Sequence, residues 1–377
     1  MTRTPATRAV AYFGTYDRAY PRNAVLIDGL RGRGVDVLEF QAPLPPLSAA
    51  EMAGPPGAAR LAAGVAAAHL RLLVQHRRHL DVDAVVVGYP GHFLVPFGRL
   101  LASVRRARLV FDPLVSLQDT FAGDRGLVPA GGATAHALRA VDAAAFRLPD
   151  LVLADTWAHG SFYQEAFGLP RRRVAVVPVG ARPEPRADGA ARALAKDEPL
   201  VVFQYGKWSP LHGADAVLEA AALLRDEPFR FVLAGEGQLS ADLRATIAAR
   251  ELRGVEWLGT LSPDDLRGRT LAADVCLGVF GRSEKAGRVI PNKVFDALAC
   301  GRPVVTADSA GAREWLHDSE TALLTPPGDG AALAAALRRL RARRERARLG
   351  AAALALYERS FTPAAVAASL LAALGTP

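Results

Sequence analysis

Residues 283–306 read SEKAGRVIPNKVFDALACGRPVVT and combine a loop, the start of a helix and a following strand. Pro291 suits the first turn of a helix, because its missing N–H needs no partner there. Gly301 would end that helix before the β-branched residues 304–306, which favour a strand. The segment therefore predicts that residues 284–290 form a loop at a helix N-terminus.

The predicted helix N-terminus is suited to an anion. Unpaired backbone N–H groups place roughly half a positive charge there, and Arg288 and Lys293 add full charges beside it. Asp296 follows Lys293 by three residues, so the two side chains share one side of the helix. A lysine could hold phosphate while the carboxylate takes a ribose diol, which predicts a nucleotide site. The alternative is an ordinary helix of an α/β sheet with incidental loop charges.

This segment resembles the donor-binding signature of glycosyltransferase family 4, a group of retaining enzymes with the GT-B fold. That signature has two glutamates separated by seven residues, where this chain has Arg288 and Asp296. The subgroup that it resembles most reads SEKAxRVIPNKV, and Glu284 could supply the missing carboxylate. The donor-binding residues that the resemblance implies here are Glu284, Arg288, Val289, Ile290, Asn292, Lys293 and Asp296.

A second motif, YGKWSPLHG at residues 205–213, follows an expected strand. The family pattern is similar to Gly-Arg followed five residues later by Lys-Gly, and those two cations grip the donor diphosphate. Lys207 takes the arginine position and His212 the lysine position. Lysine lacks the guanidinium fork, and histidine is mostly neutral at pH 7, so donor affinity should strengthen as the pH falls. The alternative is a glycine-led loop with incidental charges.

Two further glycines follow the next expected strand. Gly235 and Gly237 would let the backbone approach the donor closely, although Gly-x-Gly alone is a weak signal.

Strand-like and helix-like segments alternate along the whole chain, which predicts an α/β protein. Residues 180–199 are rich in Pro, Gly and charged residues, as an interdomain linker would be. The prediction is the GT-B architecture that the resemblance implies, two Rossmann-like parallel-sheet domains facing a cleft. The expected parts are an acceptor-side domain at 1–183, a nucleotide-sugar donor domain at 197–360, and a helix at 361–377 that returns to the first domain.

The first domain contributes the candidates for the acceptor side. Gly14 and Thr15 follow the first strand, the usual place of an acceptor or phosphate loop. His92 and Asp112 stand at the ends of neighbouring strands. Retaining transfer needs a group that aligns the acceptor hydroxyl and stabilises oxocarbenium-like charge. Asp112 is the first catalytic candidate and His92 the second, and the alternative for each is a structural hydrogen bond.

Composition limits the possible classes of protein. A chain of 377 residues, half of them apolar, exceeds one ordinary core, so two domains are expected. Two cysteines in apolar positions, no apolar stretch typical of a secretory signal and no run of about eighteen apolar residues predict a cytoplasmic protein.

The net charge of +8 has two interpretations. Basic residues in the segment 71–79 and at 105–108 could contact anionic lipid at the inner face of the membrane, although a solvated helix face is the simpler alternative. Aromatic residues are sparse and are not interleaved with these basic residues, which argues against nucleic acid as a partner.

The sequence thus predicts a bacterial, metal-independent, retaining glycosyltransferase of the hexosyltransferase type, without a cofactor. It would move a sugar from a nucleotide-diphosphate sugar to an acceptor such as a cell-envelope glycolipid or a polysaccharide intermediate. Asp81 and Asp83 precede an expected strand and would therefore lie at its amino end. Ligands of such sheets bind at the carboxyl ends of the strands, so we do not expect these two aspartates to hold a metal at the donor site. Two alternatives remain. One is a non-catalytic nucleotide-sugar binding subunit, since Arg288 replaces a carboxylate, and the other is a nucleotide-sugar epimerase of the same fold.

Overall fold

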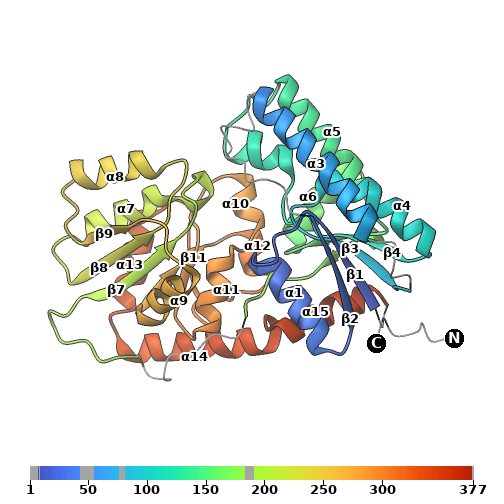
Figure 1. Ribbon diagram of the computed structural model, residues 1–377. Coiled ribbons are helices and arrows are strands. Elements are labelled where there is room, and N and C mark those ends of the chain that lie inside the picture. Colours follow the sequence, from blue (N-terminus) through green and yellow to red (C-terminus); the bar gives the residue numbers. More distant parts are fainter. Residues whose placement is uncertain (1–6, 8, 43–54, 76–80, 183–190, 376–377) are drawn as a thin grey trace. The chain divides into compact units, whose positions relative to one another are not determined.

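The computed structural model describes residues 7, 9–42, 55–75, 81–182 and 191–375 of the chain. These residues divide into two compact units, Met1–Val179 with Pro363–Pro377 and Gly180–Thr362. Each unit has a parallel sheet with helices packed against it (Figure 1). No helix within the described ranges is long and apolar enough to cross a membrane.

The first unit is built on a six-stranded parallel sheet in the order β2-β1-β3-β4-β5-β6. Its central strand β3 is the run AVVV, and all four residues are buried, as expected of a parallel strand covered on both faces. The strands are β1 (Ala9–Gly14), β2 (Asp36–Gln41), β3 (Ala84–Val87), β4 (Arg108–Phe111), β5 (Leu151–Ala154) and β6 (Val174–Val176).

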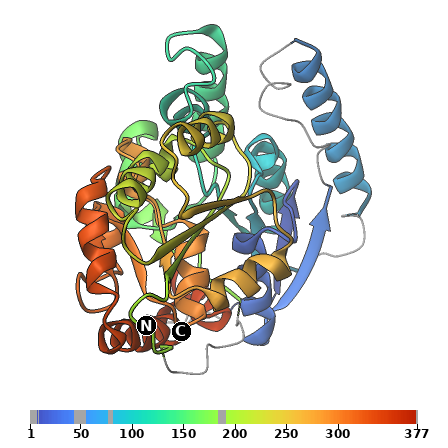
Figure 2. The same ribbon diagram turned by 90° about the vertical axis from the view of Figure 1, so that its left-hand side faces the viewer.

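Helices cover this sheet, and α3 runs along the outside of the unit (Figure 2). Short 3₁₀ segments lie at His92–Leu94 and Arg171–Arg173, and a π-helical segment lies at Asp119–Asp124. The α-helices are α1 (Pro21–Gly32), α3 (Pro55–Gln75), α4 (Val95–Arg105), α5 (Ala133–Arg147), α6 (Trp157–Phe167) and α15 (Pro363–Ala373).

The last helix of the chain, α15, belongs to the first unit and packs against α1. The contact is close, because a Cβ on Gly29 would lie 1.9 Å from the carbonyl oxygen of Pro363. Val366 and Leu370 on α15 join the same buried cluster as Leu26 on α1. Glycine at position 29 therefore allows the C-terminal helix to seat on the N-terminal unit.

The second unit has its own six-stranded parallel sheet, in the order β12-β11-β10-β7-β8-β9. Strand β7, the first in sequence, lies in the interior of this sheet between β10 and β8. The strands are β7 (Leu200–Tyr205), β8 (Phe229–Ala234), β9 (Val255–Leu258), β10 (Val275–Leu277), β11 (Val304–Ala307) and β12 (Leu323–Thr325).

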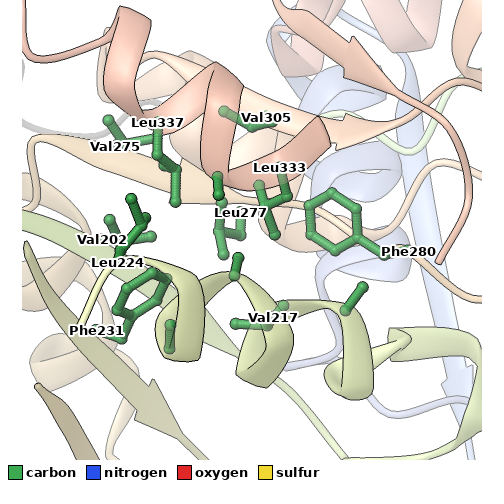
Figure 3. Packing of buried hydrophobic residues seen from close by; sticks show 14 of the residues in the cluster. Val202, Val217, Leu224, Phe231, Val275, Leu277, Phe280, Val305, Leu333 and Leu337 are labelled. Atoms are coloured by element: carbon green, nitrogen blue, oxygen red, sulfur yellow. The ribbon is translucent and has the colours of Figure 1, made fainter. Parts of the chain in front are cut away.

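A core of aliphatic and aromatic side chains joins this sheet to its helices. Val217 on α7, Leu333 and Leu337 on α13, and Leu277 on β10 are all buried in it (Figure 3). Burying such a side chain stabilises the fold by about 1.5–3 kcal/mol relative to leaving it exposed. The helices of this unit are α7 (Ala214–Leu223), α8 (Ser240–Ala249), α9 (Pro263–Ala272), α10 (Glu284–Arg288), α11 (Asn292–Ala299), α12 (Ala310–Arg313), α13 (Gly330–Arg339) and α14 (Arg343–Ser360).

The segment 283–306 differs in detail from the sequence prediction. The stretch expected to be a loop contains the short helix α10, because the Ser283 hydroxyl accepts a hydrogen bond from the Ala286 N–H and caps it. Pro291 is the extended N-cap of α11 and not its first helical residue. Gly301 ends α11 with a φ of 64°, a left-handed conformation that glycine adopts without strain.

Candidate functional site

Three loops of the second unit meet at the carboxyl edge of its sheet. They follow β7, β8 and β10, which are neighbours in the order β10-β7-β8. The carboxyl ends of parallel strands share one edge, where ligands of open α/β sheets bind. The helix α11, which carries Lys293 and Asp296, comes after the third of these loops.

Lys293 is the most unusual side chain at this edge. It lies in the first turn of α11 and is only 6% exposed. Its Nζ has no hydrogen-bond partner among the described residues, although it lies 5.9 Å from the centre of the Tyr205 ring. Burial lowers the pKa of Lys293 to about 7. A buried ammonium without a counter-ion is costly, and an anionic ligand would remove that cost.

Gly206, the first residue after β7, brings Lys293 and His212 together. A Cβ at this position would lie 2.2 Å from His212 Nε2 and 3.0 Å from Lys293 Nζ. Both nitrogens therefore approach the backbone at Gly206. A larger residue would separate these two side chains or displace the loop.

The orientation of His212 is set by the start of its own turn. The Ser209 N–H donates a hydrogen bond to His212 Nδ1 at 3.3 Å, in a capping box at the 3₁₀ turn Pro210–His212. Because Nδ1 accepts, the ring proton of a neutral His212 belongs on Nε2. The histidine therefore presents an N–H donor on the side of Gly206, where an anion could accept it.

Asp296 lies one turn after Lys293 and is oriented by a tyrosine. The Tyr205 hydroxyl donates a hydrogen bond to the Asp296 carboxylate. Burial raises the pKa of Tyr205 well above its ordinary value, and Asp296 raises it further, so the phenol keeps its proton. The sequence motif contained Tyr205, but no pattern marked it as the partner of Asp296, because the two positions are 91 residues apart.

The loop that contains Lys207 is approached closely by the two glycines of the next loop, Gly235 and Gly237. Lys207 is exposed. A Cβ on Gly235 would lie 2.2 Å from the Gly206 carbonyl oxygen, and one on Gly237 would lie 2.4 Å from the Trp208 nitrogen. The close approach that these glycines allow is thus to the chain's own loop, and their contact with a donor stays a prediction.

The residues expected on α10 and after it are partly engaged with one another. Arg288 is 13% exposed and forms an ion pair with Glu284 at 3.2 Å. Glu284 itself is 91% exposed. Val289 and Ile290 line a small pocket of about 10 Å³, which has room for about one water molecule. Asn292 is half-buried at the start of α11.

In the first unit Asp112 lies in a buried ion pair. Its side chain is 1% exposed and accepts hydrogen bonds from Arg22 Nε at 2.7 Å and from Arg22 Nη2 at 3.0 Å. Arg22 Nη1 also donates to the carbonyl oxygens of Val177 and Pro178. The carboxylate is therefore already neutralised, as the structural alternative for Asp112 requires, and its catalytic role stays a prediction.

His92 belongs to a different buried network. Its Nε2 donates to the Val115 carbonyl oxygen at 2.9 Å and lies 3.7 Å from Asp142. Burial lowers its pKa, while Asp142 opposes that change. The ring also meets Phe111 edge to face. The structure thus places His92 in a packed core, with a structural hydrogen bond, and does not join it to Asp112.

The loop after β1 is also closed by local contacts. Thr15 is 6% exposed and its hydroxyl donates to the Pro90 carbonyl oxygen. Gly14 has a φ of 131°, which only glycine adopts readily. The Thr15 hydrogen bond therefore joins two loops at the carboxyl edge of the first sheet, and binding of an acceptor by Gly14 and Thr15 stays a prediction.

Known proteins resemble this chain in sequence. Residues 199–343 match the family model described as Glycosyl transferases group 1. D-inositol 3-phosphate glycosyltransferase of Nocardia farcinica is 36% identical over 217 residues, covering 53% of this chain and 46% of that protein. Amylovoran biosynthesis glycosyltransferase AmsK of Erwinia amylovora is 27% identical over 194 residues, covering 50% and 46%. The chain thus spans about half the length of these curated relatives.

Solved structures resemble nearly the whole chain. Anabaena Alr3699/HepE in complex with UDP and glucose has a TM-score of 0.66 at 17% identity, covering 98% of this chain and 100% of that one. Sucrose-phosphate synthase from Thermosynechococcus elongatus has a TM-score of 0.71 at 18% identity, covering 97% of each. The protein therefore has the GT-B fold that the sequence predicted. It carries a glycosyl transferases group 1 domain at residues 199–343.

Proposed function

We propose that this protein is a glycosyltransferase that moves a sugar from a nucleotide-diphosphate sugar to an acceptor. The observation that carries the proposal is Lys293, a buried ammonium without a partner among the described residues. It lies with His212 beside Gly206, at the edge of the sheet where nucleotides bind. A diphosphate would neutralise the lysine and accept the histidine N–H.

The same groups would assist the chemistry. Charge builds on the diphosphate as its bond to the sugar breaks, and preorganised cations stabilise that charge more than they stabilise the bound donor. Lys207, His212 and Lys293 supply these donors without a metal. The Tyr205 hydroxyl orients Asp296, and this carboxylate would accept the ribose hydroxyls. Retention of configuration and independence of a metal are part of the proposal, and both rest on the family resemblance.

The donor and acceptor are supported only by the relatives. The Anabaena protein was solved with UDP and glucose, which favours a uridine nucleotide as the first donor to test. The Erwinia relative is named for amylovoran biosynthesis, which favours a polysaccharide intermediate as the acceptor.

Membrane contact remains part of the proposal for the acceptor side. Leu100 and Val104 on α4 are 59% and 67% exposed, and Arg106 and Arg108 beside them are exposed too. This combination suits an anionic lipid surface. The basic residues 76–79, which belonged to the same prediction, lie outside the described residues.

One observation favours a second candidate, a subunit that binds the donor without turning it over. The family signature has a glutamate at position 288, whereas here Arg288 is paired with Glu284. If transfer needs that carboxylate, this protein would bind a nucleotide sugar and leave it intact.

The test is a calorimetric screen of UDP-, GDP-, ADP- and TDP-sugars, with and without EDTA, followed by analysis of the products. We expect one nucleotide to bind selectively, Lys293→Met and Asp296→Asn to weaken it, and the matched surface variant Lys196→Met to leave it unchanged. Slow release of sugar from the bound donor would support transferase chemistry, an altered sugar would indicate an epimerase, and an intact donor would favour the binding subunit. Binding of no donor would overturn the site itself.

A further inference from the structure

A second pocket lies at the opposite edge of the same sheet. Asp274 directly precedes β10 and Pro303 directly precedes β11, so the pocket is at the amino ends of these strands. Its volume is about 120 Å³, which approaches the roughly 150 Å³ of a cavity that holds a benzene ring. The pocket is lined by Ala191, Asp274, Gly301, Arg302, Pro303, Arg346, Ala347, Gly350, Ala351 and Leu354.

Arg346 is the most deeply buried charge of this pocket. It is 1% exposed. Its Nη1 donates to the carbonyl oxygens of Leu340 and Arg341 at 2.7 Å, and its Nη2 donates to that of Arg192 at 2.7 Å. Its Nε has no hydrogen-bond partner in the part of the chain that the structure describes. The guanidinium is thus held firmly in place while one buried N–H lacks an acceptor.

Arg302, on the loop before β11, also has a buried Nε without a hydrogen-bond partner among the described residues. It donates to the Leu271 carbonyl oxygen through Nη2. Two residues that line the pocket therefore each carry a buried guanidinium N–H without an acceptor. Leaving such a donor unpaired costs about 1–3 kcal/mol, and more when the group is charged.

The charges around the pocket are unbalanced. Asp274 is its one acidic lining residue, and Arg192 already holds that carboxylate through Nε at 2.8 Å and Nη2 at 2.6 Å. Burial lowers the pKa of Arg346, Asp274 opposes this, and the nearby Arg192, Arg341 and Arg343 lower it further. The surroundings therefore repel added positive charge and favour an anion.

The remaining wall of the pocket is formed by small apolar side chains. Ala347, Ala351 and Leu354 come from one face of α14, and Pro303 comes from the loop before β11. An inorganic ion would leave most of this surface uncovered, whereas a ring or a short hydrocarbon would cover it and gain the usual benefit of burying apolar area.

We infer that this pocket is a second binding site, which takes a small organic anion with its carboxylate or phosphate on Arg302 and Arg346 and its apolar part against α14. The site is separate from the proposed donor site, because α11 runs from Lys293 in its first turn to Ala299, just before Gly301 and Arg302. The inference does not depend on the proposed function, since binding can be measured without a donor or an acceptor.

The experiment uses four probes, benzoate, phenyl phosphate, neutral benzamide and inorganic phosphate, titrated into the full chain and followed by calorimetry. We expect benzoate or phenyl phosphate to bind at least tenfold more tightly than both benzamide and inorganic phosphate. The tighter binder of the two shows whether the site prefers a carboxylate or a phosphate. Equal binding of benzamide would show that the arginines are not used, and absence of binding by both organic anions would overturn the inference.

Matched variants locate the binding. Arg302→Met should weaken the organic anion about tenfold, the loss expected for one charge-assisted hydrogen bond. Ala347→Phe, which fills the pocket, should abolish binding. The controls are Arg359→Met and Ala355→Phe, which change exposed residues of α14 that do not line the pocket. Arg346 is left intact, because its three carbonyl contacts hold the local fold. Equal loss in the controls and in the pocket variants would place the binding elsewhere.

Discussion

The carboxyl edges of the two sheets handle buried charge in opposite ways. In the first unit Asp112 and Arg22 neutralise each other, and two backbone carbonyls take a further nitrogen of the arginine. In the second unit Lys293 is also buried, but its ammonium has no hydrogen-bond partner among the described residues. A compensated pair needs nothing more from outside, whereas an uncompensated charge gains from a ligand of the opposite sign. The contrast separates a structural ion pair from a binding group.

The largest effect should come from breaking the compensated pair. Arg22→Met leaves the Asp112 carboxylate buried without its counter-ion, and we expect a loss of about 3–5 kcal/mol in the free energy of unfolding. Urea denaturation measures this loss. The double variant Arg22→Met with Asp112→Leu should recover much of it, because no charge is then left buried. An Arg22→Met protein as stable as wild type would mean that the Arg22–Asp112 ion pair does not stabilise the fold.

Removing the uncompensated charge of Lys293 should leave the stability of the fold intact and weaken donor binding, the reverse of the effect expected for Arg22. Lys293→Met should keep or raise the stability of the free protein near pH 6, because it removes a buried ammonium. We expect donor affinity to fall by about 2–3 kcal/mol, or about 30- to 150-fold, since a charge-assisted contact to phosphate is lost. Thermal unfolding and donor calorimetry on the same variant give both values. Lower stability with unchanged donor affinity would assign Lys293 to the fold instead.

The pH dependence of donor affinity tests whether Lys293 is the uncompensated charge that binds the donor. Because burial lowers the pKa of Lys293 to about 7, its ammonium is largely lost in the free protein above that pH. A bound diphosphate would raise this pKa, so donor binding should take up a proton and weaken about tenfold for each pH unit between pH 8 and 9. Calorimetry in buffers of different ionisation enthalpy measures the uptake. The Lys293→Met protein should lack it, and equal proton uptake in both proteins would point to another group.

The free energy of unfolding of the free protein should also depend on pH through Lys293. An unfolded lysine binds its proton up to its ordinary pKa of 10.5, whereas folded Lys293 releases it near pH 7. The unfolded state therefore binds more protons in this window, and this residue makes stability rise as the pH increases from about 7 toward 10. Denaturation of wild type and Lys293→Met across that range isolates its contribution. Identical slopes for the two proteins would contradict the lowered pKa.

The smallest effect concerns the orientation of His212. Ser209→Ala keeps the Ser209 N–H but removes the hydroxyl of the capping box, which should cost about 1 kcal/mol of stability. Donor affinity should fall only a few-fold, because Lys293 and Lys207 remain. Ser262→Ala, which removes the N-cap hydroxyl of α9, serves as the control for a lost cap. A donor affinity that falls equally in both variants would show that the His212 orientation is not the cause.

Much of this arrangement was available from sequence patterns. The period of apolar residues predicted the two parallel sheets, because buried parallel strands such as AVVV in β3 need apolar residues on both faces. The spacing of Lys293 and Asp296 placed both on one side of a helix that begins at the carboxyl edge of the sheet. The short helix α10 was missed, because it depends on a single serine cap that an ordinary loop could also contain.

Contacts between distant segments could not be predicted in the same way. Nothing in the local sequence pairs Arg22 with Asp112, Tyr205 with Asp296, or Gly206 with Lys293. Each pair joins two different elements, and its geometry depends on how those elements pack. Gly235 and Gly237 also received a ligand interpretation from sequence, whereas the fold shows that they pass close to the chain's own backbone.

The sequence by itself determined the class of fold, because the periodicity of apolar residues is a local property of the chain. Its spacing and its family resemblance also predicted the edge of the sheet where a nucleotide could bind and the residues that could bind it. Only the tertiary structure decided which buried charges are neutralised, because compensation depends on distances between segments that are far apart in sequence. That is why Asp112 and Lys293, both expected to act on substrate, differ once their neighbours are known. One already has its counter-ion within the fold, and the other lacks a partner among the described residues.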